Sequence, residues 1–146
     1  MALFNPSRDQ VRQFFFDAWT KFKLQQQLTQ LEAIVIEVAQ MHPEYQHVLD
    51  APEKYKEQAY FPEMGETNPF LHMSLHMSIL EQIAIDQPSG IAGAYQALQL
   101  RYQDQHRAQH DLMDCLAETI WQAQRENKSP EPELYLGCIR QKVNAA

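Results

Sequence analysis

Two pairs of histidines have a spacing that suits a metal ion. His72 and His76 are four residues apart, and so are His106 and His110. In a helix, residues four apart lie about 40° apart around the axis and one turn apart along it. Each pair can therefore direct two imidazoles at one point. Neutral imidazole is a ligand for Zn, Fe, Ni or Cu, so the spacing predicts a metal-binding helical protein.

Carboxylates extend the second pair. His106, His110, Asp114 and Glu118 follow one another at intervals of four residues. Carboxylate ligands shift the preference of a site toward Fe or Mn. We therefore predict one divalent transition metal (Zn, Fe, Ni or Mn), held by the two histidine pairs together with Asp114 or Glu118. Three protein ligands plus water would make a catalytic site, whereas four would close the site and make it structural.

Two familiar metal patterns are excluded by the neighbours of the histidines. Met73 and Arg107 stand where a zincin-type peptidase has the glutamate of His-Glu-x-x-His. A ferritin-like di-iron site needs a glutamate three residues before a histidine, and this chain has Pro69, Met73, Gln103 and Arg107 there. A mononuclear site remains, compatible with a hydrolase or transferase that uses metal-bound water.

The alternative is a histidine cluster without metal. Histidines on an apolar helical face can be hydrogen-bonded core residues or can pair with Asp114 and Glu118. The protein would then be a non-catalytic structural or interaction module, which leaves open a protein partner or a homo-oligomer. His42 and His47 flank a short helical piece, and we predict that both lie on the surface.

The cysteines are expected to be reduced. Cys115 and Cys138 fall on separate predicted helices and form neither a disulfide framework nor a Cys-x-x-Cys motif. Cys115 lies opposite His106 on its helical wheel, which predicts a buried and inert thiol. No secretory signal is visible at the N-terminus. These observations together predict a cytoplasmic protein.

The pattern of apolar residues and helix breakers predicts an all-α fold. A first helix starts at Asn5-Pro6-Ser7, and a second starts at Thr29, where Glu32 completes a capping box. His42-Pro43 ends the second helix. The further expected elements are short helical pieces at 43–49 and 52–59, a loop at 61–67, a helix from Asn68-Pro69 to about Gln87 and a last helix at 131–142.

Residues 91–126 form either one long helix or two. The break, if present, lies near 101–104, where Asp104 could cap the second helix. Both arrangements bring the two histidine pairs toward each other. We expect a compact bundle of about five to seven helices in a single domain over residues 1–146.

Charge excludes two classes of partner. Twelve Lys and Arg against nineteen Asp and Glu give a net charge of −7. Nucleic acids and anionic membrane surfaces both attract cationic patches, so we predict neither as a partner. The uncharged stretch from Thr67 to Leu80 is too short to span a bilayer.

Several segments resemble a known family. They are residues 4–8 (FNPSR), 17–19 (DAW), 68–76 (NPFLHMSLH), 81–82 (EQ), 86–91 (DQPSGI) and the series His106, His110, Met113, Cys115, Leu116, Glu118, Trp121, Gln124 and Arg125. Together they resemble the bacterial domain of unknown function 1841, over roughly residues 3–142. The resemblance implies a proteobacterial, cytoplasmic protein and supplies no reaction.

Overall fold

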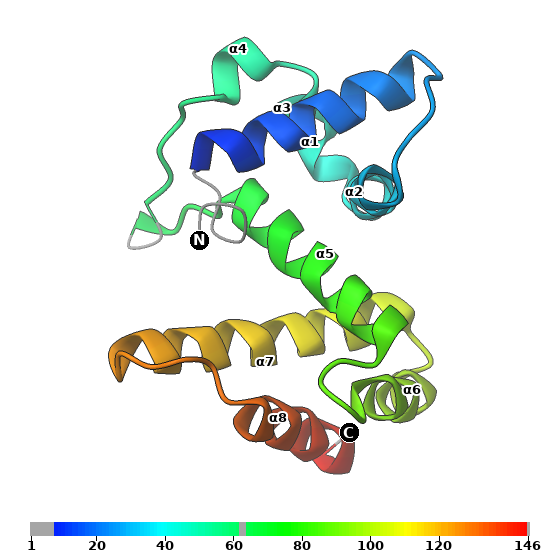
Figure 1. The fold of residues 1–146 in the computed structure, drawn as a ribbon, viewed down its shortest axis with the longest axis vertical. Helices are drawn as coiled ribbons and strands as arrows, with labels where there is room; N and C mark the ends of the chain where they lie inside the picture. The colour runs from blue at the N-terminus through cyan, green and yellow to red at the C-terminus, as the bar shows by residue number, and fades with distance from the viewer. Residues whose placement is uncertain (1–7, 62–63, 146) are drawn as a thin grey trace. The chain divides into compact units, whose positions relative to one another are not determined.

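A computed structural model describes residues 8–61 and 64–145, and all regular structure in these ranges is helical (Figure 1). This confirms the all-α prediction. The helices are α1 (Arg8–Lys23), α2 (Gln30–Met41), the 3-10 helix η1 (Pro43–Tyr45), α3 (Gln46–Leu49), α4 (Pro52–Tyr55), α5 (Pro69–Ile85), α6 (Ile91–Tyr102), α7 (Gln105–Arg125) and α8 (Pro132–Ala145). The eight α-helices slightly exceed the number predicted. The expected start at Asn5-Pro6-Ser7 lies outside the described residues.

The chain divides into two compact units within α5. One unit ends at Ser74 and the other begins at Leu75, so α5 carries residues of both. The expectation of a single domain stays a prediction.

In the first unit, α1 packs against α2 and α3. Its apolar face buries Phe15, Phe16 and Trp19, and the Phe16 ring lies 5.6 Å from that of Phe70 at the start of α5. Arg12 is also buried and donates hydrogen bonds to three backbone carbonyls, those of Tyr55, Lys56 and Gln58. This guanidinium ties the chain that follows α4 to α1.

The ends of α2 are as predicted. The Thr29 side chain accepts a hydrogen bond from the backbone N–H of Glu32, and the Glu32 carboxylate accepts one from the backbone N–H of Thr29. Each satisfies an N–H that the first turn of a helix leaves open. His42 is the C-cap residue, and Pro43 begins η1 directly after it. The helical piece expected at 52–59 is shorter, because α4 ends at Tyr55.

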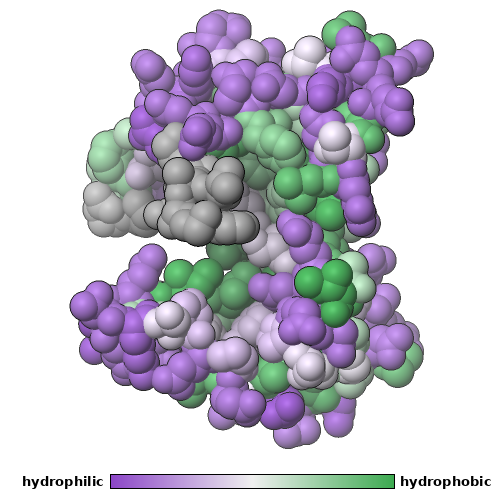
Figure 2. All heavy atoms as spheres, in the orientation of Figure 1, coloured by the Kyte–Doolittle hydropathy of each residue, from purple (hydrophilic) through white to green (hydrophobic). Residues whose placement is uncertain are grey.

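In the second unit, α6, α7 and α8 pack against one another (Figure 1). Their apolar faces form one core together with Ile79 of α5, and its fully buried isoleucines and leucines are Ile79, Ile91, Leu98, Leu112 and Ile139. The turn between α7 and α8 is hydrophilic (Figure 2), and there Lys128 forms ion pairs with Glu126 and Glu131. None of the described helices is long and apolar enough to cross a membrane.

The segment 91–126 is two helices. Gln103 takes the left-handed conformation, with φ of 51°, and ends α6. Asp104 then caps α7, because its carboxylate accepts a hydrogen bond from the backbone N–H of Arg107 at 3.2 Å. The structure therefore confirms the break and its cap. The cap places His106 and His110 in the first two turns of α7.

The prediction of reduced cysteines is wrong. A disulfide joins Cys115 on α7 to Cys138 on α8. The two cysteines are 23 residues apart, and the expected separation onto two helices was correct. Two cysteines on neighbouring helices form no sequence motif that would indicate a bond between them. Only the pairing of α7 with α8 reveals that they face each other.

Candidate functional site

Helix α5 carries His72 and His76 on successive turns. The helix starts where predicted, because the Asn68 side chain accepts hydrogen bonds from the backbone N–H groups of Phe70 and Leu71 at 3.0 and 3.2 Å. His72 is half-buried and His76 is fully buried. His72 belongs to the first compact unit and His76 to the second.

In the second unit, His76 lies beside the histidines of α7. Its ring centroid is 5.4 Å from that of His110 and 6.4 Å from that of His106. The rings of His106 and His110 are 4.1 Å apart. His106 is exposed and His110 is half-buried. Three of the four histidines singled out by their spacing therefore lie together in this unit.

A hydrogen-bond chain fixes the buried ring of His76. Its Nε2 lies 2.5 Å from Oε1 of Gln109, and Nε2 of Gln109 donates to the Tyr95 hydroxyl at 3.2 Å. Gln109 and Tyr95 are themselves buried. An amide oxygen can only accept a hydrogen bond, so Nε2 of His76 carries a proton. In a neutral imidazole, Nδ1 is then the nitrogen with the lone pair.

The ring of His110 has the opposite tautomer. Its Nδ1 lies 2.8 Å from the backbone carbonyl oxygen of His106, one turn earlier on α7. Nδ1 is therefore the donor, and in a neutral ring Nε2 carries the lone pair. The helix itself sets the orientation of this imidazole.

In the first unit, His72 lies beside His42. The two ring centroids are 4.6 Å apart, and Tyr45 stacks on His42 at 5.3 Å. Nδ1 of His42 lies 3.0 Å from a carboxylate oxygen of Glu44, to which it donates. Burial raises the pKa of the Glu44 carboxyl, but the hydrogen bond from His42 and the nearby imidazoles outweigh it, so that this pKa is lowered.

The predicted surface position of His42 is wrong. This side chain is only 2% exposed, whereas His47 is exposed as predicted. A signal was available, because the buried stripe of α2 includes Val35, Val38 and Ala39, and His42 continues that stripe by one turn. The proline that follows His42 suggested a helix end and hid this continuation.

The two predicted carboxylates lie elsewhere. Asp114 and Glu118 are both exposed. They line a cavity of about 460 Å³ between α7 and α8, together with residues that include Cys138 and Lys142. Residues spaced by four do not stay on one line along a helix, because each step of four turns the side chain about 40° further around the axis. Asp114 and Glu118 therefore point away from the direction of His106.

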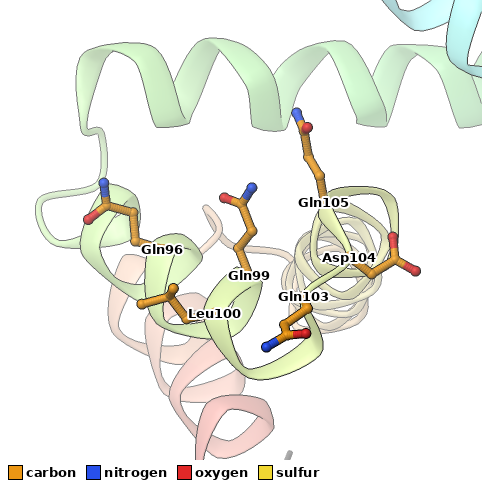
Figure 3. A pocket seen from close by; sticks show the side chains of 6 residues that line it. All are labelled: Gln96, Gln99, Leu100, Gln103, Asp104 and Gln105. Carbon is orange, nitrogen blue, oxygen red and sulfur yellow. The ribbon is translucent and has the colours of Figure 1, made fainter.

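A second, larger hollow of about 760 Å³ lies where α6 meets α7 (Figure 3). Its lining residues are Gln96, Gln99, Leu100, Gln103, Asp104 and Gln105. The side chains of Gln96, Gln99 and Gln105 extend toward the same side (Figure 3). These amides can donate and accept hydrogen bonds, but none is a nucleophile or a general base at neutral pH.

The comparison with protein families decides the assignment. A family model described as "Domain of unknown function (DUF1841)" matches residues 7–141, nearly the whole chain. The chain belongs to the DUF1841 family. This confirms the resemblance drawn from the sequence motifs. No curated protein and no solved structure matches the chain significantly.

Proposed function

We propose that this DUF1841 protein binds one divalent transition metal ion through His42, His72, His76 and His110. What supports the proposal is the continuity of α5, which holds His72 and His76 about 6 Å apart along its axis. His42 adjoins His72 within the first unit, and His110 adjoins His76 within the second. Each of the four side chains offers one ring nitrogen as a ligand.

The hydrogen bonds of three of these rings suit ligation. A histidine that binds metal donates its other ring N–H to a carboxylate, a carbonyl or water, which fixes the tautomer. His42 donates to Glu44, His110 to the carbonyl of His106, and His76 to the amide oxygen of Gln109. The nitrogens proposed for the metal are therefore Nε2 of His42 and His110 and Nδ1 of His76.

The ligand set favours borderline metals. Four imidazoles suit Zn, Ni or Fe, and Mn is a weaker candidate because the proposed set contains no carboxylate. The proposal gives no ligand role to Asp114 or Glu118, which are exposed and line a different cavity. Four bound imidazoles would make a structural site. Three with a water in the fourth position would lower the pKa of that water and support a hydrolase or transferase.

Metal analysis of untagged protein after gentle purification tests the proposal. We expect about one transition metal per chain, and a melting temperature that falls after chelation and recovers with Zn, Ni or Fe. Metal at about 100 times its Kd adds roughly 2.7 kcal/mol, which for a chain of this size raises the melting temperature by roughly 5–10 °C. Substoichiometric metal, together with a melting temperature that no added metal changes, would refute the proposal.

Histidine variants locate the ion. His76→Ala and His110→Ala should each abolish stoichiometric metal. His47→Ala is the matched control, because His47 is exposed, contacts the ring of Tyr55 and is not one of the proposed ligands. The control should bind metal as wild type does. Equal loss in all three variants would point to adventitious surface binding.

The second candidate is a hydrogen-bonded histidine cluster in a non-catalytic interaction module. The observation that favours it is the chain from His76 through Gln109 to Tyr95, which partners a buried ring nitrogen without any metal. This candidate predicts a melting temperature insensitive to chelator, and a molecular mass in light scattering that rises with concentration or on adding a partner. The net charge of −7 supports a partner other than nucleic acid.

The predicted cytoplasmic location stays a proposal drawn from the sequence. The disulfide between Cys115 and Cys138 weighs against it, because disulfides are rare in reducing compartments. Alkylation of free thiols in freshly lysed cells would test whether the bond exists where the protein resides.

A further inference from the structure

One cysteine of the disulfide, Cys138, lines a cavity, and the other, Cys115, is not among the residues that line it. Cys138 on α8 is half-buried and lines the 460 Å³ cavity between α7 and α8. Cys115 on α7 is fully buried in the core of the second unit. A solute that enters the cavity can reach Cys138, whereas Cys115 is screened by packed side chains.

The same cavity is acidic. Asp114 and Glu118 line it from α7, and both carboxylates are exposed. Its one lysine, Lys142 on α8, has its Nζ 3.9 Å from a carboxylate oxygen of Asp111, which offsets part of its positive charge. Two carboxylates against one lysine that is itself paired make the lining net negative, which concentrates small cations and disfavours small anions.

We propose that the disulfide is a thiol–disulfide exchange site, entered at Cys138 and selective for small cationic thiols. Aminothiols are the chemical class that fits, because they carry an ammonium group for the carboxylates and a sulfur for the exchange. The proposal uses neither the histidines nor a metal, and it stands or falls independently of the proposed function.

The exchange balances in two steps. The thiolate of the aminothiol attacks Sγ of Cys138, the bond to Cys115 breaks, and Sγ of Cys115 leaves with the electron pair and takes up a proton. The product is a mixed disulfide on Cys138 and a free thiol at Cys115. A second aminothiol can then displace Cys138 as a thiol, which leaves the small molecule as its own disulfide and the protein reduced by two electrons.

Burial of Cys115 favours the closed disulfide over the mixed disulfide with a small thiol. Opening the bond leaves the charged sulfur of Cys115 among packed apolar side chains, where it is poorly solvated, so that Cys115 is a poor leaving group and the opening is slow. Once opened, Cys115 stays close to Cys138, since both helices remain packed through residues such as Leu112 and Ile139. Cys115 can then attack the mixed disulfide and close the bond again. The wild-type protein should therefore hold the adduct only transiently.

A trapping experiment tests the site. The full-length Cys115→Ser variant retains Cys138, and we would expose it to cystamine, a dicationic disulfide, and to oxidised glutathione, which is anionic. Peptide mapping after an acid quench should find the adduct on Cys138. Cystamine should react at least about threefold faster than oxidised glutathione at low ionic strength, and the two rates should converge as salt is raised. The mirror variant, Cys138→Ser, should leave Cys115 unmodified while the protein is folded.

Charge variants distinguish the effect of the cavity's carboxylates on the reaction rate from the intrinsic reactivity of the two reagents. Adding Asp114→Asn and Glu118→Gln to the Cys115→Ser variant should remove most of the preference for cystamine. Glu126→Gln is the matched control, because Glu126 lies on the α7–α8 turn and pairs with Lys128. That control should keep the preference.

Three outcomes would overturn the proposal. Modification of Cys115 in folded Cys138→Ser protein would show that access is not confined to one sulfur. A rate ratio that is the same with and without the two carboxylates would remove the selectivity. Circular dichroism would show at which denaturant concentration the chain unfolds. If the cysteine reacts only above that concentration, the native protein offers no exchange site.

Discussion

Nε2 of the buried His76 lies 2.5 Å from Oε1 of Gln109. The two side chains come from different helices, α5 and α7, and neither is accessible to water. A buried polar group that loses its partner costs more than the partnered hydrogen bond contributes, because it has already given up its contact with water. This pair therefore links the stability of the second unit to the tautomer of His76.

Replacement of Gln109 should damage both stability and metal binding. Gln109→Leu keeps most of the volume and leaves the N–H of His76 without its acceptor, so we expect a loss of about 1–3 kcal/mol in the free energy of unfolding. We also expect metal affinity to fall roughly 10- to 100-fold, because the ring loses the group that orients it. Urea unfolding and metal titration measure the two effects. Gln105→Leu, at an exposed position on the same helix, should change neither. Wild-type stability in Gln109→Leu would show that the ring does not depend on this acceptor.

Asp104 should determine where α7 begins. Its carboxylate satisfies the backbone N–H of Arg107, so Asp104→Ala should cost about 1 kcal/mol, whereas Asp104→Asn should cost little. Thermal unfolding followed by circular dichroism measures the difference. Asp114→Ala, at an exposed position further along the same helix, serves as the control and should stay within about 0.5 kcal/mol of wild type. Equal losses at the two positions would mean that the cap contributes nothing beyond helix propensity.

Local signals predicted the helices well. Thr29 with Glu32, and Asn68 before Pro69, mark helix starts because their side chains satisfy backbone groups within the same turn. Asp104 is a third case, although the sequence left the break beside it undecided. The feature that ends α6 is the left-handed backbone of Gln103. Glutamine rarely adopts this conformation, so its residue type did not predict the helix end.

The site was only partly predictable, because its remaining features depend on how helices face one another. Helical spacing identified His76 and His110, whose rings lie 5.4 Å apart. Spacing could not show that His42 lies beside His72, since that contact joins the C-cap of α2 to α5. For the same reason it missed the bond between Cys115 and Cys138.

Acid should weaken the capping box of α2. The hydrogen bond from the Lys21 side chain, together with that from the backbone N–H of Thr29, lowers the pKa of Glu32 from its ordinary value of 4.5. A carboxyl whose pKa is lower in the folded state stabilises that state above its unfolded pKa, and the contribution disappears as pH falls through the folded pKa. The contribution of Glu32 to the free energy of unfolding should thus be constant above about pH 5 and decline below about pH 4.5.

The Glu32→Gln variant isolates this effect. Its melting temperature should lie below that of wild type at pH 6, and the gap should narrow progressively toward pH 3. Glu37→Gln, an exposed position on the same helix, should show a smaller gap at pH 6. A gap that stays constant from pH 6 to pH 3 would contradict an ionised Glu32 as the stabilising form.

Loss of the disulfide should destabilise the second unit. The bond closes a loop between residues 23 apart, and the loop-entropy model gives roughly 3 kcal/mol for a loop of this size. The double variant Cys115→Ala/Cys138→Ala should therefore unfold at lower urea concentration than wild type. Reductant should shift wild type toward the variant and leave the variant unchanged, which separates the bond from other effects of the reagent. If oxidised wild type and the double variant unfold at the same urea concentration, the disulfide does not restrain the unfolded chain as the loop-entropy model requires.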